Sequence, residues 1–446
     1  MRLLPESTDA LHPAVSVGEK VTEYLEPASA DLTLAQLSFA DKKQFGESAF
    51  WQKWYAAFKD VLPIYLAIHL IIFIISCLAF LLVSKDSSKH IQPLYILWQQ
   101  WQHWDANYYV GIATLGYTNR QVMAFFPLYP LLIRGVMFVT HSPDVAGLLI
   151  SNSAEMAMFT ILYRLVAEDF GKERAYYTVL YFAIFPSAFF FSGIYTESLF
   201  LCLSTLTFYQ IRHGRWFLAG ICACFASLTR PDGMYLALPF CYEYFSRIWQ
   251  QQGLSLQAFL VRKQTVTFLK GIRWDICFGL LFFGGVLLFM AYGFVHFQDF
   301  LAFVHAHKYW GRHTAFPGVG MLRSVWSILH QGFLSYIGVH NMLELGTDLF
   351  ALVMIVLMFV GPWKFEPKLW AYGIYSLALF IYFQMVPVGG LLPLESMERF
   401  LLEIFPLFIL FSSLNKYRTI HLSYCLVASG LLVFMLTLFL TNHWMV

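Results

Sequence analysis

The chain has 446 residues, of which 59% are hydrophobic and only 13% are charged, and its formal net charge is +2 at pH 7. A water-soluble fold could not bury this much apolar side chain, because too few polar residues remain to cover it. The composition excludes a soluble cytosolic enzyme, a disordered chain and a disulfide-stapled secreted domain, and the small net charge gives no reason to expect a nucleic-acid partner. We therefore predict an all-α, multi-pass membrane protein.

The first 60 residues are polar and mixed in charge, and we expect them to form a cytoplasmic N-terminal tail. Within this tail, residues 45–59 place aromatic side chains at helical spacing, which predicts an amphipathic helix in the membrane interface. Residues 61–446 are expected to form one transmembrane domain. Its first span is Val61 to Val83, which is long enough to cross a hydrocarbon core of about 30 Å.

Further apolar runs follow, and each should be helical because backbone hydrogen bonds must close within a segment in lipid. The runs cover residues 145–166, 175–194, 198–211, 216–228, 234–245, 276–297, 349–363, 369–388, 400–414 and 422–440. Proline and glycine in Thr229–Gly233 predict a break between two short helices. Residues 125–139 are short and contain prolines, so we interpret them as a partial or re-entrant helix. The expected bundle has 10–12 spans.

Basic residues predict which connections face the cytoplasm. They gather near residues 164–174, 212–215, 247–273, 364–368 and 416–418. The positive-inside rule places these connections on the cytoplasmic side. The opposite face then holds an external loop (84–124), the turns at Glu197 and Arg230, and a second long loop (298–348).

The stretch from Trp98 to Tyr109 reads WQQWQHWDANYY and is unusually aromatic. Such a stretch is typical of a helix that lies in the lipid headgroup layer. Asp105 lies inside it, so its carboxylate is partly desolvated and favours a hydroxyl group or a cation as its partner. A solvated interfacial aspartate is the alternative interpretation.

Two motifs resemble a known family. Residues 104–117 read WDANYYVGIATLGY and residues 124–134 read AFFPLYPLLIR. Together they resemble the GPI mannosyltransferase 2 (PIG-V) family and its bacterial relatives, which are membrane glycosyltransferases of the GT-C class. Residues 185–200 and 218–233 resemble the same family in the same order, and the end of the chain matches weakly around Glu398 and Arg399.

The resemblance implies a reaction and a fold. A sugar, which we expect to be mannose, moves from a polyprenyl-phosphate donor to a lipid or glycan acceptor on the non-cytoplasmic face. Asp105 is implied as the general base of an inverting transfer, a role that typically contributes about 10²–10⁴-fold. The implied enzyme is independent of metal and has no cofactor other than its lipid-phosphate co-substrate.

The leaving phosphate needs cationic partners, because negative charge develops on it. The outward-facing candidates are Arg230, Lys308, Arg312 and Arg399. The predicted substrate-binding residues are Trp104, Tyr108, Glu197, Arg230, Lys308 and Arg399. For both Arg230 and Arg399 an internal salt bridge is an equal alternative, and the positive end of a helix dipole would also explain Glu197.

The loop 298–348 is rich in histidine, including His305, His307 and His313. A metal site is one interpretation, but Lys308 and Arg312 lie among these histidines and disfavour a second cation, so we predict none. A contact with a phosphate or a lipid headgroup and a plain interfacial loop are the other two interpretations.

Other functions are compatible with a membrane bundle. A transporter or flippase for lipid-linked sugars is the main alternative, and a catalytically silent subunit is a third. Transporters place ionisable groups near the midplane of repeated halves, whereas here such groups gather towards one face without a visible repeat. We expect the donor, a glycolipid or glycan acceptor and the bilayer as partners. The membrane is expected to be a bacterial plasma membrane, with the endoplasmic reticulum as the alternative, and the oligomeric state is not indicated.

Overall fold

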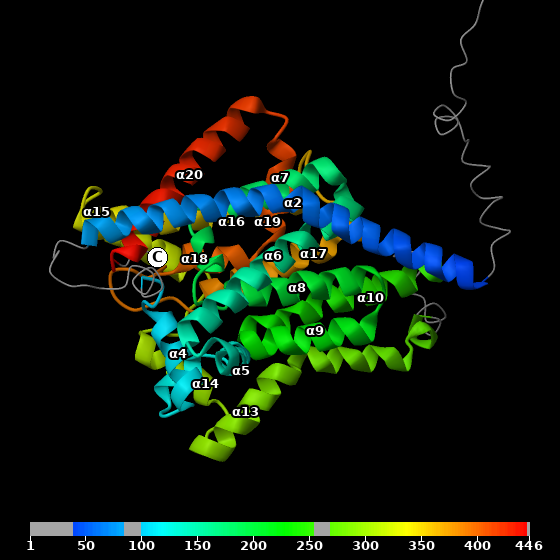
Figure 1. Cartoon of the computed structure of the whole chain (residues 1–446), viewed down its shortest axis with the longest axis horizontal. Coiled ribbons are helices and arrows are strands. Elements are labelled where there is room, and N and C mark those ends of the chain that lie inside the picture. Colours follow the sequence, from blue (N-terminus) through cyan, green and yellow to red (C-terminus); the bar gives the residue numbers. More distant parts are fainter. Residues whose placement is uncertain (1–38, 84–99, 254–267, 444–446) are drawn as a thin grey trace, which may run out of the picture. The chain divides into compact units, whose positions relative to one another are not determined.

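The computed structural model describes residues 39–83, 100–253 and 268–443 (Figure 1). The chain divides into two compact units, Met1–Ala56 and Ala57–Val446. In the first unit the described residues belong to the start of helix α2 (Phe39–Val83). The expected interfacial helix and the first expected span are thus one continuous helix, which continues through Pro63. The domain boundary at residue 60 stays a prediction, and residues 84–99 of the expected catalytic loop lie outside the described residues.

The second unit is built from helices. In chain order the α-helices after α2 are α4 (Asp105–Leu115), α5 (Leu128–Thr140), α6 (Pro143–Phe170), α7 (Lys172–Ala183), α8 (Glu197–Arg212), α9 (Trp216–Thr229), α10 (Ala237–Gln251), α13 (Gly284–Phe297), α14 (Ala302–Ala306), α15 (Val319–Gln331), α16 (Tyr336–Phe359), α17 (Trp370–Gln384), α18 (Met397–Phe400), α19 (Pro406–Phe411) and α20 (Arg418–Leu440). Short 3₁₀ helices include η1 (Gln121–Ala124), η2 (Ala188–Phe191), η3 (Pro231–Leu236), η4 (Trp274–Phe283), η5 (His307–Trp310), η6 (Pro367–Leu369), η7 (Leu401–Glu403) and η8 (Ser412–Leu414). No strand occurs in the described ranges, which confirms the all-α class.

Five helices in the described residues are long and apolar enough to cross a membrane by length and composition. They are Phe50–Leu81, Pro143–Phe170, Trp274–Phe297, Tyr336–Phe359 and Arg418–Leu440. The partial helix expected at 125–139 is α5, and the break expected at Thr229–Gly233 separates α9 from η3 and α10. The span expected at 400–414 is a run of short helices, with α19 between η7 and η8. The count of 10–12 spans stays a prediction.

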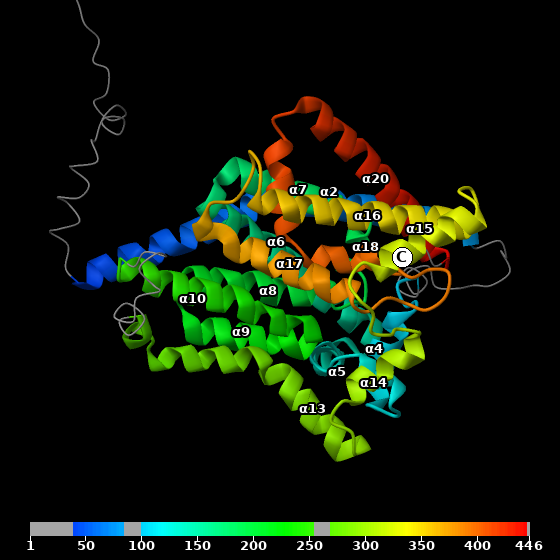
Figure 2. The same cartoon turned by 180° about the vertical axis from the view of Figure 1, so that it is seen from behind.

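Helices α6, α8, α9 and α10 lie side by side in both views (Figures 1 and 2), and α13 continues from η4 along α9. Close packing depends on glycine. A Cβ atom on Gly285 would lie 2.3 Å from the backbone nitrogen of Leu228, and one on Gly233 would lie 2.4 Å from that of Ser227. Because small residues let helix backbones approach closely, these two glycines hold α13 and η3 against the end of α9.

Aromatic packing fixes the segment that precedes α4. Phe439, near the end of α20, has its ring centroid 5.8 Å from that of Trp101 and 5.1 Å from that of Trp104. The same ring contacts Phe190 and Tyr195, which are buried between η2 and α8. Residues far apart in the chain therefore position the start of α4.

Candidate active site

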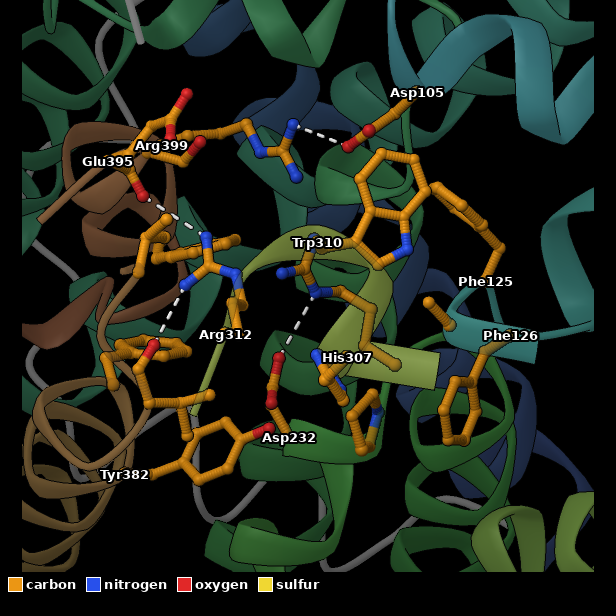
Figure 3. A pocket seen from close by; sticks show the side chains of 18 of the residues that line it. Asp105, Phe125, Phe126, Asp232, His307, Trp310, Arg312, Tyr382, Glu395 and Arg399 are labelled. Atoms are coloured by element: carbon orange, nitrogen blue, oxygen red, sulfur yellow. Dashed lines mark hydrogen bonds and ion pairs between the residues drawn. The ribbon is translucent and has the colours of Figure 1, made fainter. Parts of the chain in front are cut away.

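A cavity of about 430 Å³ opens where five separate stretches of the second unit meet (Figure 3). Its volume lies within the roughly 300–1,000 Å³ that is usual for small-molecule sites. The lining residues come from 104–109, 124–126, 229–232, 307–312 and 382–400. Three of the sequence-predicted side chains, Asp105, Arg230 and Arg399, lie together in this lining, as does the predicted Trp104.

Asp105 is the first residue of α4, and 19% of its side chain is exposed. Its Oδ2 atom lies 2.7 Å from Nη1 of Arg399, and Figure 3 shows the two groups facing each other. No ion pair of the Oδ1 atom occurs among the described residues. The carboxylate is thus oriented by one oxygen while the other remains available towards the cavity.

Two lining residues that are not glycine have left-handed backbone conformations. Trp104 has φ 46° and Ser396 has φ 72°. Such conformations are costly for side chains with a Cβ atom and concentrate at functional sites. Glu344 of α16 holds the turn at Ser396, because its two carboxylate oxygens each accept a backbone N–H, from Ser396 and from Glu398, at 3.0 Å. This turn leads directly into Arg399.

Arg399 and Arg230 are linked by Glu197, the first residue of α8. Glu197 Oε1 lies 3.0 Å from Nε of Arg399 and 3.3 Å from Nη1 of Arg230. Glu197 is fully buried and is not among the lining residues. The structure therefore places this predicted substrate-binding residue behind the two arginines rather than in the cavity wall.

Arg230 has an extended backbone at the break after α9, which turns its side chain towards three carboxylates. Besides Glu197, it lies 3.2 Å from Asp232 and 2.6 Å from Glu403. Two arginines and four carboxylates thus form one network, consisting of Asp105, Glu197, Arg230, Asp232, Arg399 and Glu403. The internal salt bridges expected as the alternative are present for both arginines, which also line the cavity, and their contact with a phosphate stays a prediction.

Arg312 belongs to another stretch of the lining, residues 307–312. Its backbone pairs with Val388, and its guanidinium donates hydrogen bonds to the carbonyl oxygens of Val386 at 3.1 Å and Glu395 at 3.2 Å. The guanidinium carbon also lies 4.9 Å from the ring centroid of Phe400. The carboxylate of Glu395 lines the same cavity, and its negative charge acts on Arg312.

The two kinds of arginine differ in their electrostatics. Burial alone would lower the pKa of Arg399, but Asp105 and Glu197 raise this pKa above its usual range. For Arg312, burial and then the positive charge of Arg399 lower the pKa of the guanidinium, and the negative charge of Glu395 opposes this shift only in part.

The histidines of the loop 298–348 do not converge on one point. His305 pairs with Asp299 at 2.7 Å, and His313 hydrogen-bonds to Arg323 at 3.0 Å. Only His307 lines the cavity, where Figure 3 shows it beside Asp232. Burial, and after it the charge of Arg312, lowers the pKa of His307 to about 4, so this imidazole is neutral near pH 7.

Two further residues that were predicted to bind substrate, Tyr108 and Lys308, lie outside the cavity lining. Tyr108 stacks on Phe125 with a centroid distance of 4.9 Å and makes an edge contact with Trp310, so it supports two aromatic residues of the wall. Lys308 is exposed and is not a lining residue, although His307 and Trp310 are.

Sequence reasoning left Asp232 and Glu403 out of the site. Asp232 follows Arg230 by two residues at a helix break, and Glu403 lies inside a run that we interpreted as a span. An ionisable residue within an apolar segment is itself a functional signal, so Glu403 could have been found. His307 could not have been separated from its neighbouring histidines, because their side chains diverge only in the folded loop.

Parts of the chain are similar in sequence to proteins that are named mannosyltransferases. The family model described as dolichyl-phosphate-mannose-protein mannosyltransferase matches residues 122–261. The human protein named GPI alpha-1,6-mannosyltransferase 2 is 28% identical over 161 residues, 33% of this chain and 33% of its own. GPI mannosyltransferase 2 of Schizosaccharomyces pombe is 29% identical over 178 residues, 39% of this chain and 38% of its own. The resemblance to the GPI mannosyltransferase 2 family that the motifs predicted is confirmed.

These similarities are partial. The chain covers about a third of the length of these two curated relatives. Among solved structures, ArnT from Cupriavidus metallidurans, bound to undecaprenyl phosphate, has a TM-score of 0.43 and 13% identity over 72% of this chain and 57% of its own. An Archaeoglobus fulgidus oligosaccharyltransferase has a TM-score of 0.38 and 11% identity over 84% of this chain and 53% of its own.

Proposed function

We propose that the protein is an inverting membrane mannosyltransferase that uses a polyprenyl-phosphate mannose as its donor. Its acceptor is a hydroxyl group of a glycolipid or glycan, and Asp105 is the general base. The observation that carries this proposal is the Asp105 carboxylate in the wall of the cavity, held 2.7 Å from Arg399. The names of the sequence relatives support mannose as the sugar.

The geometry suits the base that such a transfer needs. Arg399 contacts only the Oδ2 atom of Asp105, so the Oδ1 atom is left to accept a proton from an acceptor hydroxyl. Arg399 is itself held by Glu197, and the turn before it is anchored by Glu344. A base held in place by such supporting contacts keeps its orientation through the reaction.

The reaction balances without another reactant. The acceptor oxygen attacks the anomeric carbon of the sugar as its proton passes to Asp105. The bond between that carbon and the phosphate oxygen breaks on the opposite side, and its electron pair leaves with the lipid phosphate. Attack and departure on opposite sides invert the configuration at the anomeric carbon.

The cavity wall also supports a lipid-linked substrate. Apolar and aromatic side chains, among them Phe125, Phe126, Phe383 and Val386, share the lining with the charged network. A site of this kind can receive a phosphorylated sugar next to an isoprenoid chain. In the proposal the site faces the non-cytoplasmic side of a bacterial plasma membrane, with the endoplasmic reticulum lumen as the alternative, and it works without metal.

The test uses the purified full-length protein in detergent or nanodiscs with a panel of polyprenyl-phosphate sugars. We expect transfer or slow hydrolysis with the mannose donor, and a loss of about 10²–10⁴-fold in the Asp105→Asn variant. Asp299→Asn is the matched control, because Asp299 pairs with His305 away from the cavity lining. If the protein is inactive with every donor but moves the donor across a vesicle membrane, it is a flippase and not a glycosyltransferase.

A further inference from the structure

Three polar side chains of the cavity wall take no part in the transfer step as proposed. They are Asp232 of η3, His307 of η5 and Tyr382 of α17, and all three are lining residues. Figure 3 shows them in the lower half of the view, with Asp105 near the top. The negative charge of Asp232 acts on both the imidazole and the phenol. Three separate elements therefore bring these groups to one end of the cavity.

The backbone and one ion pair fix the position of Asp232. It precedes Gly233, which packs against the end of α9 so closely that a Cβ atom would not fit. Only 2% of Asp232 is exposed, and its Oδ2 atom lies 3.2 Å from Nε of Arg230. Arg230 also pairs with two other carboxylates, so its positive charge is shared among three groups. Asp232 therefore presents a fixed hydrogen-bond acceptor with negative charge to its neighbours.

His307 and Tyr382 have hydrogen-bonding atoms that the protein does not use. Neither side chain makes a hydrogen bond within the part of the chain that the structure describes. With its pKa lowered to about 4, the imidazole is neutral near pH 7, so it has one donor and one acceptor. The phenol also donates and accepts. Because polar groups inside proteins normally have partners, these atoms are available to a ligand.

The charges around this end of the cavity select the chemistry of that ligand. A phosphate group would be repelled by the carboxylate of Asp232. A cation would meet Arg230, which already pairs with Asp232, and Arg312, whose charge reaches His307. A hydroxyl group fits all three side chains, since it donates to a carboxylate and accepts from an imidazole or a phenol. A ring with adjacent hydroxyl groups would bond to two of them at once.

We propose that Asp232, His307 and Tyr382 form the subsite that binds the hydroxyl groups of a sugar ring. The inference rests on the proposed function, because it names the part of the same cavity that recognises the sugar. The ring belongs either to the lipid-linked donor or to the acceptor glycan, which share this chemistry. A site that hydrogen-bonds a substrate hydroxyl discriminates against analogues that lack it, so these residues set the specificity for the sugar.

The test separates binding of the sugar from binding of the lipid phosphate. Full-length protein in nanodiscs is titrated with a short-chain polyprenyl-phosphate mannose and with the same polyprenyl phosphate without sugar. A further titration adds methyl mannoside to protein saturated with polyprenyl phosphate, and thereby examines the acceptor side. The variants are Tyr382→Phe, His307→Ala and His307→Gln. Tyr235→Phe is the matched control, because the Tyr235 ring lies 5.1 Å from that of Tyr382 but is not a lining residue.

We expect Tyr382→Phe and His307→Ala each to weaken binding of a sugar ligand about three- to tenfold, because each removes one hydrogen bond. A loss with the sugar-bearing lipid identifies the donor sugar, and a loss with methyl mannoside identifies the acceptor sugar. His307→Gln keeps a donor and an acceptor, so it should restore most of the affinity. The affinity for sugar-free polyprenyl phosphate and the behaviour of Tyr235→Phe should not change.

Two results would overturn the inference. One is unchanged affinity of Tyr382→Phe and His307→Ala for both sugar ligands. The other is an equal loss for polyprenyl phosphate with and without its sugar, because these residues would then support the phosphate or the fold. If Tyr382→Phe does not fold, the two His307 variants decide by the same criteria. Failure of the proposed function has a different signature, since sugar binding would still depend on these residues while the wild type transfers no sugar.

Discussion

Helix α8 carries an arginine–carboxylate network at each end, and the two networks do different things. At its start Glu197 joins the cavity network, and at its last residue Arg212 pairs with Asp169 at 2.8 Å and with Glu243 at 3.0 Å. The helix has 16 residues, so the networks lie about 24 Å apart. Similar residues in similar pairs therefore do not by themselves define a site.

The two networks differ in the residues and the space that surround their ion pairs. The network of Arg212 is supplemented by Arg247 and by the hydroxyl of Tyr372, which donates to Asp169 at 2.7 Å. None of these residues lines the 430 Å³ cavity. The network at Glu197 adjoins two residues with positive φ, Trp104 and Ser396, and an open cavity. Strain and open volume together distinguish a reactive site from a structural ion-pair network.

The largest expected effect comes from removing the central arginine of the cavity network. Arg230→Gln would leave Glu197, Asp232 and Glu403 without their shared cation, and breaking a buried pair in this way typically costs about 3–5 kcal/mol. We expect a large fall in the melting temperature and loss of transfer. A melting curve close to that of the wild type would show that these carboxylates do not need Arg230.

The matching substitution at the other end of α8 tests whether the Arg212 network is purely structural. Arg212→Gln should also lower the melting temperature, but less, because Arg212 is more exposed than Arg230 and Arg247 still contacts Glu243. The folded fraction should keep its transfer rate per molecule. A transfer rate that falls tenfold in the folded fraction would show that the two networks are coupled through α8.

A smaller effect is expected from relieving strain in the cavity wall. Ser396→Gly would allow φ 72° without a Cβ atom, while the backbone N–H that donates to Glu344 remains. We expect the free energy of unfolding to rise by about 0.5–1 kcal/mol. Chemical denaturation measures this change, and destabilisation instead would show that the serine side chain outweighs the strain.

The last prediction concerns the pH dependence of stability that arises from His307. The folded protein has its pKa near 4 and the unfolded chain near 6.5, so the unfolded chain binds a proton that the folded protein does not. Stability from this group is therefore present above pH 6.5 and is lost as the pH falls towards 4, at no more than about 1.4 kcal/mol per pH unit. Melting temperatures of His307→Gln should depend less on pH in this range. An unchanged pH dependence would contradict a neutral, half-buried His307.

Sequence patterns could predict the helical class, the break after Thr229 and the placement of Asp105, Arg230 and Arg399 at one site. These features depend on local signals, such as apolar length, proline and a family motif. The partners of each arginine could not be predicted, because Glu403 and Glu344 approach the site only through packing of segments that are distant in the sequence. The contacts of Arg312 with Val386 and Glu395 likewise exist only in the folded chain.

The most direct test of the account measures single-turnover transfer and donor binding on the same preparations of wild type and Asp105→Asn. We predict that the asparagine variant binds the polyprenyl-phosphate donor within about twofold of the wild type, because asparagine has nearly the same size and shape as aspartate. The rate of sugar transfer should fall by about 10²–10⁴-fold, since no base remains to take the acceptor proton. Transfer by Asp105→Asn at the wild-type rate would contradict the account.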